Sequence, residues 1–85
     1  MQQAITALRL EPLRSLTPAD KVVWLYLAAS GPGEHGVRDV AEGTGLAKGT
    51  VQSALGALQA AGLVAQLEPG GARRPARLEA RAPTA

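Results

Sequence analysis

Residues 36–64 read GVRDVAEGTGLAKGTVQSALGALQAAGLV, and this stretch decides the fold. A short helix is predicted over residues 37–44, and Gly45 directly after it can supply the positive φ of a tight turn. A second helix is predicted over residues 48–61, because its apolar residues recur at spacings of three, four and seven: Val51, Ala54, Leu55 and Leu58. Two helices joined by a tight turn have the layout of a helix-turn-helix.

A third helix is predicted before this pair, over residues 17–29. Thr17 can cap it and proline follows at the first helical position. Asp20 lies at the third position, where its carboxylate can reach back to free backbone amides. The helix is apolar on nearly all sides and stops at Ser30-Gly31-Pro32-Gly33, so we expect it to be buried on more than one face.

The two ends of the chain are predicted to cover this three-helix core. Residues 3–10 are expected to be helical and to end before Pro12, with apolar side chains that can pack on the first core helix. At the other end, Gly62 is expected to close the last helix in a left-handed conformation. Two short strands, 63–68 and 73–81, then flank a Pro-Gly-Gly-Ala turn, which is a hairpin signal.

Composition excludes several classes of protein. The chain has 85 residues, no Cys and one His, so disulfides and cysteine-ligated metals are excluded and the single His cannot form a zinc site alone; we expect no metal. The longest apolar run, residues 22–29, is far shorter than the ~20 residues that span a bilayer. The N-terminus lacks the pattern of a signal peptide, so we expect a cytoplasmic protein without a membrane partner. Serines without a neighbouring base and scattered acids predict no enzyme, no cofactor and no small-molecule ligand.

The exposed residues of the helix-turn-helix and the hairpin suit an anionic partner. The first turns of the second helix are expected to be outward, small, polar or cationic, and free of carboxylates: Lys48, Gly49, Thr50, Gln52 and Ser53. Such a helix can enter the DNA major groove, and its N-terminal amides can bind phosphate. The hairpin adds three arginines that can bind phosphate as well: Arg73, Arg74 and Arg77.

The stretch quoted above resembles the winged helix-turn-helix of bacterial transcription regulators, such as the MarR-like and related groups. LTPADKVVWLYLA resembles the helix that precedes it in these families, and the resemblance covers residues 16–81. It implies an α+β fold, mainly α: a three-helix core, a C-terminal two-stranded β-hairpin wing and a short N-terminal extension. It also implies binding to double-stranded DNA, with recognition helix 48–61 in the major groove and wing 69–77 on the backbone.

The expected organisation is one domain with two short appendages. Residues 1–16 form an N-terminal extension on the first core helix and are a candidate homodimer contact, 17–81 form the winged helix-turn-helix domain, and 82–85 form a flexible tail. The predicted function is that of a small transcription regulator. Two alternatives stay open: a winged-helix protein–protein interaction module, and a replication or partition component of a plasmid or phage.

Overall fold

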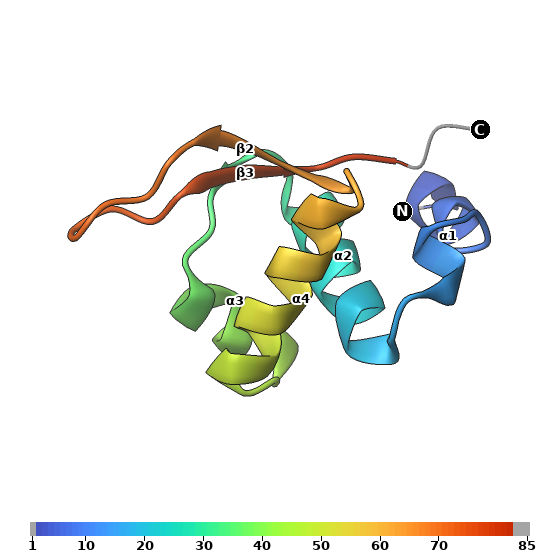
Figure 1. The fold of residues 1–85 in the computed structure, drawn as a ribbon, viewed down its shortest axis with the longest axis horizontal. Helices are drawn as coiled ribbons and strands as arrows, with labels where there is room; N and C mark the ends of the chain where they lie inside the picture. Colours follow the sequence, from blue (N-terminus) through green and yellow to red (C-terminus); the bar gives the residue numbers. More distant parts are fainter. Residues whose placement is uncertain (1, 83–85) are drawn as a thin grey trace.

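The computed structural model describes residues 2–82. Helices α2, α3 and α4 form the core, and a small sheet lies along one side of it (Figure 1). The mainly helical α+β class with a hairpin wing is confirmed. In chain order the elements are α1 (Gln2–Ala7), a 3-10 turn (Leu13–Ser15), α2 (Pro18–Ser30), β1 (Gly33–Glu34), α3 (Val37–Thr44), α4 (Lys48–Ala60), β2 (Val64–Glu68) and β3 (Arg77–Ala80).

Helix α2 begins as its sequence predicts and holds the sheet in place. The backbone amide of Asp20 donates a hydrogen bond of 3.2 Å to the Thr17 hydroxyl. Trp24 is buried, and its indole N–H donates to the carbonyl oxygens of Leu63 and Arg81, at 3.1 and 3.2 Å. One side chain of α2 therefore contacts the backbone at the start of β2 and just after β3.

Two glycines end the two helices of the helix-turn-helix. Gly45 follows α3 with a φ of 77°, and its amide donates to the Ala41 carbonyl at 2.9 Å. Gly62 follows α4 with a φ of 76°. Both conformations lie in the left-handed region, where glycine meets no steric penalty. The predicted turn and the predicted end of the second helix of the pair are confirmed.

The core draws on the N-terminal segment, the three core helices and strands β2 and β3. The N-terminal segment contributes Ala7 and Leu13, which are buried in the same cluster as the helix-turn-helix side chains. Packing of this segment is therefore part of the fold, while the division of the chain at residue 16 stays a prediction. The other buried apolar residues are Val23, Trp24, Leu27, Val40, Val51, Ala54, Leu55, Leu58, Leu63, Val64 and Leu78.

The sheet differs from the predicted hairpin in two ways. It has three antiparallel strands in the order β1–β3–β2, because β1, which lies in a predicted loop, pairs with β3. A two-residue strand beside glycine and proline carries no alternating pattern, so the sequence gives no sign of it. The strand predicted over 73–81 is also shorter, at Arg77–Ala80, and the wing before it is a turn closed by a bridge between Gly71 and Arg74.

Three smaller observations complete the fold. The imidazole of His35 is half-buried, with Nε2 2.8 Å from the Gly31 carbonyl and the ring edge-on to Tyr26. None of the helices within residues 2–82 has the length and apolarity needed to cross a membrane. The tail predicted at 82–85 lies, apart from the exposed Ala82, outside the described residues.

Candidate nucleic-acid interface

Helix α4 divides cleanly into a buried stripe and an exposed face. Its apolar residues Val51, Ala54, Leu55 and Leu58 are all buried. With 100° of rotation per residue, the residues between them must point away from the core. All five predicted contact residues of this helix are indeed exposed: Lys48, Gly49, Thr50, Gln52 and Ser53.

The N-terminus of α4 is open. Ala47 occupies the N-cap and offers no side-chain acceptor, and the first turn contains no acidic residue. The first backbone bond of the helix runs from the Val51 amide to the Ala47 carbonyl, so the amides before Val51 have no helical partner. Uncapped amides at the positive end of a helix dipole are a suitable site for a phosphate oxygen.

The outermost line of α4 has almost no side chains. Gly49, Ser53, Gly56 and Ala60 follow one another at spacings of four, three and four, opposite the buried stripe. A Cβ atom added at Gly49 or Gly56 would meet nothing within 4 Å. Packing within the described chain therefore does not require glycine at either position, and the backbone of α4 is accessible to a partner.

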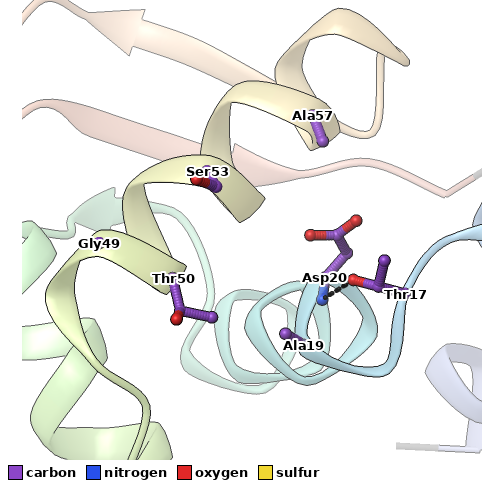
Figure 2. A pocket seen from close by; sticks show the side chains of 7 residues that line it. All are labelled: Thr17, Ala19, Asp20, Gly49, Thr50, Ser53 and Ala57. Carbon is purple, nitrogen blue, oxygen red and sulfur yellow. Dashed lines mark hydrogen bonds between the residues drawn. The ribbon is translucent and has the colours of Figure 1, made fainter.

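Grooves run along both flanks of α4. The first, of about 460 Å³, separates α4 from the start of α2 and is lined by Thr17, Ala19, Asp20, Gly49, Thr50, Ser53 and Ala57 (Figure 2). The second, of about 380 Å³, lies against α3 and is lined by Arg38, Ala41, Glu42, Gly45, Leu46 and Lys48. The predicted residues are thus split: Thr50 and Ser53 face α2, Lys48 faces α3, and Gln52 lines neither groove.

The wing carries its arginines in two settings. Arg73 and Arg74 are exposed in the turn between β2 and β3, which projects beyond α3 at the end of the molecule opposite α1 (Figure 1). Arg77 begins β3, and its Nε lies 3.8 Å from a carboxylate oxygen of Glu68. This pair is exposed, so it contributes little to stability and leaves Arg77 accessible. The structure therefore places Arg73 and Arg74 as the wing cations without an intramolecular ion pair among the described residues.

Two residues of these grooves are absent from the predicted set. Arg38 is exposed in the first turn of α3 and lines the same groove as Lys48. Its position at the start of the first helix of the helix-turn-helix is the signal that could have identified it. Asp20 was predicted only as a capping residue, and the sequence alone does not place it across a groove from α4. Within residues 2–82, no group of three His, Asp or Glu side chains could hold a metal ion.

These features define a winged helix-turn-helix DNA-binding domain of the kind found in bacterial transcription regulators, which is not a class of enzymes. The chain belongs to the IclR helix-turn-helix domain family, whose model matches residues 26–68, just over half of the sequence. The matched stretch runs from the middle of α2 to the end of β2, so the wing arginines lie beyond it. A comparison with curated proteins found no match.

Two solved structures share the fold. NMB1585, a MarR family regulator from Neisseria meningitidis, has 25% sequence identity and a TM-score of 0.63, over 80% of this chain and 46% of its own. Bordetella bronchiseptica BpsR, whose DNA binding is regulated by 6-hydroxynicotinic acid, has 25% identity and a TM-score of 0.64, over 94% of this chain and 56% of its own. The chain thus spans about half the length of these regulators.

Proposed function

We propose that α4 is the recognition helix of this domain and lies in the major groove of double-stranded DNA. The observation that carries the proposal is the open N-terminus of α4, which has an alanine cap, no acid in the first turn and only exposed side chains on its outer face. By contrast, the Thr17 hydroxyl caps α2, and α3, whose N-cap Gly36 also makes no side-chain bond, carries the acidic Asp39 in its first turn. A helix N-terminus with free amides and no neighbouring acid attracts phosphate.

Different residues then have different tasks. Thr50, Gln52 and Ser53 lie near base edges, where hydroxyl and amide groups can read hydrogen-bond patterns. Lys48 contacts phosphate, and the exposed Arg38 beside the same groove adds a further phosphate contact. Gly49 lets the backbone of α4 approach the DNA closely.

The wing contacts the phosphate backbone of the DNA outside the groove that α4 enters. Arg73 and Arg74 contact phosphate. Arg77 does so as well after its ion pair with Glu68 breaks, and breaking this exposed pair costs little free energy. Phosphate contacts of this kind position the protein and do not read sequence. Bound protein then regulates transcription by occupying its site, where it blocks or recruits polymerase.

A homodimer through the N-terminal segment completes the proposal. Ile5 and Leu10 of this segment are exposed by 49% and 40%, although both are large and apolar. Helix-turn-helix dimers bind two half-sites about one helical turn apart, so a second copy would supply the second recognition helix. In this arrangement residues 1–16 serve as the contact and residues 17–81 as the DNA-binding unit.

The experiment is a fluorescence anisotropy titration of a labelled mixed-sequence duplex at two salt concentrations. Each phosphate contact contributes about −0.9 to the slope of log K against log salt. Arg73→Ala with Arg74→Ala should therefore make this slope less negative by about 1.8. The matched control is Lys21→Ala with Arg81→Ala, which removes the same charge from residues outside the wing, both grooves and the N-terminal segment, and should leave the slope nearly unchanged.

The outcomes separate the alternatives. An unchanged slope in the wing variant removes the wing from the interface, and equal loss in both variants assigns the effect to net charge. No binding at either salt, together with a mass that rises with protein concentration, would instead favour a protein-interaction module. Gln52→Ala should change the preference among duplex sequences, whereas the wing variant should weaken all of them alike.

A further inference from the structure

Asp20 is a buried acid whose carboxylate has no partner among the residues that the structure describes. The residue is only 9% exposed, yet no hydrogen bond or ion pair to its carboxylate is found within residues 2–82. Its amide donates to Thr17, but the return bond from the Thr17 amide to the carboxylate, which would complete a capping box, is not formed. The amide of Asp20 therefore takes part in the cap of α2, but its carboxylate does not make the bond to a free backbone amide that its position predicts.

The carboxylate faces the groove between α2 and α4. Figure 2 shows it rising from α2 into the space beneath Ser53 and Ala57, away from the Thr17 hydroxyl. No fully buried side-chain oxygen or nitrogen among the described residues lacks a partner, so the carboxylate oxygens remain open to solvent through this groove. A cation that enters the groove would therefore meet a carboxylate that no described residue already pairs.

The lining of the groove selects the chemistry of a ligand. One carboxylate supplies the only charge, the hydroxyls of Thr50 and Ser53 can accept or donate hydrogen bonds, and the methyl groups of Ala19 and Ala57 are apolar. The groove is an open depression of about 460 Å³, along which one small molecule could lie. A metal ion would need more carboxylates than one, whereas an organic ammonium needs a single anionic partner and an apolar surface for its carbon skeleton.

We propose that this groove binds a small organic ammonium ion, paired with the carboxylate of Asp20. A molecule bound there would cover Thr50 and Ser53, which the proposed function places near base edges. The ligand and DNA should therefore compete, and this second step rests on the proposed function. The site itself does not, because it depends only on Asp20 and the groove.

Binding is tested first without DNA, by NMR titration of the 15N-labelled protein with benzylammonium chloride at constant ionic strength. Saturable shifts are expected at the amides of Gly49, Thr50 and Ser53, and none with the neutral benzyl alcohol. Asp20→Asn should weaken binding by roughly tenfold or more, since it removes a charge-assisted hydrogen bond. Asp39→Asn is the matched control, because Asp39 also occupies the third position of its helix but lines neither groove.

A second variant, Ala57→Leu, tests the groove by filling it and keeps the charge of Asp20. It should abolish the shifts even if Asp20→Asn fails to fold, as judged by circular dichroism. Absence of saturable shifts in the unmodified protein would overturn the site, as would equal affinity in Asp20→Asn or Ala57→Leu. Binding of benzyl alcohol as strong as that of benzylammonium would also overturn it, because an apolar groove would then suffice.

Competition is tested second, by adding benzylammonium to the labelled duplex titration at constant ionic strength. The unmodified protein and Asp39→Asn should release DNA, and Asp20→Asn should hold it. Retention of DNA by all three proteins would overturn the competition. Saturable NMR shifts in a protein that binds no duplex would instead contradict the proposed function and leave the ammonium site supported, so the two failures are distinguishable.

Discussion

Helices α2 and α4 are both thirteen residues long and cross in the same core, but they begin in opposite ways. Both N-caps have nearly the same backbone conformation, with φ and ψ of −65° and 158° at Thr17 and −68° and 151° at Ala47. The side chain of Thr17 accepts a hydrogen bond and the first turn of α2 contains an acid, whereas the side chain of Ala47 accepts none and the first turn of α4 contains no acid. The backbone at Ala47 thus has the conformation of a capping residue, but its side chain cannot form a cap.

The same contrast extends along the two helices. Helix α2 has no glycine between its caps, whereas α4 contains Gly49 and Gly56, each of which disfavours a helix by about 0.5–1 kcal/mol relative to alanine. Helix α4 therefore depends on its buried apolar residues for stability, and the glycines on its exposed face do not add to that stability. This loss of helix stability on the exposed face is what the proposed DNA interface on α4 would require.

The largest expected effect comes from breaking that buried stripe. Leu58 is fully buried between α4 and the rest of the core. Leu58→Ala should lower the free energy of unfolding by about 2–5 kcal/mol, because it removes apolar contacts and leaves a cavity. Urea denaturation followed by the fluorescence of Trp24 measures the change.

The control for this variant lies on the opposite side of the same helix. Ser53 is exposed, and Ser53→Ala should alter the free energy of unfolding by no more than about 0.5 kcal/mol. Equal losses in the two variants would contradict the division of α4 into a structural and a binding face.

The second effect, of intermediate size, comes from exchanging the caps. Thr17→Ala should destabilise the protein by about 1 kcal/mol, because the Asp20 amide loses its acceptor. Ala47→Ser should stabilise it by a similar amount, since the backbone at residue 47 is already in the conformation of a capping residue. Thermal unfolding by circular dichroism measures both changes, and Ala60→Ser, an exposed substitution of the same kind at the other end of α4, is the control.

The binding consequence of this exchange sharpens the comparison. A hydroxyl at position 47 would occupy one of the amides that the proposed interface offers to phosphate, so Ala47→Ser should weaken DNA binding while it raises the melting temperature. If it raises both stability and affinity, the open N-terminus of α4 does not serve phosphate binding.

Much of this architecture could be predicted because local signals and packing agree. Thr17, Gly45 and Gly62 mark the ends of helices through capping and positive φ, and these effects act within a few residues. The exposed face of α4 follows from the spacing of its apolar residues alone. The same reasoning placed the predicted contact residues on the surface, while their role in binding DNA stays a prediction.

The features that escaped prediction depend on contacts between distant segments. Strand β1 exists because β3 pairs with it across more than forty residues, and the groove beside Asp20 exists because α2 and α4 meet there. No window of sequence contains both partners of these contacts in a recognisable pattern, so periodicity and capping rules do not reveal them.

The smallest effect is expected at Gly56, where a side chain would meet nothing in the protein. Gly56→Ala should raise the free energy of unfolding by about 0.5–1 kcal/mol, because alanine restricts the unfolded chain and favours the helix. The matched substitution Gly43→Ala in α3 should bring no such gain, since its Cβ would lie 2.7 Å from Cζ and 2.8 Å from the hydroxyl of Tyr26. The Tyr26 ring would have to move, and its edge-on contact with His35 would change with it.

Urea denaturation and duplex anisotropy together test whether Gly56 serves the interface. If α4 lies close to the DNA, the added methyl group of Gly56→Ala should weaken binding although it stabilises the fold. If the variant has higher stability and unchanged affinity, α4 does not contact the DNA at residue 56. The interface would then be limited to the first two turns of the helix. The opposite changes in stability and affinity are the result that the comparison of α2 with α4 predicts.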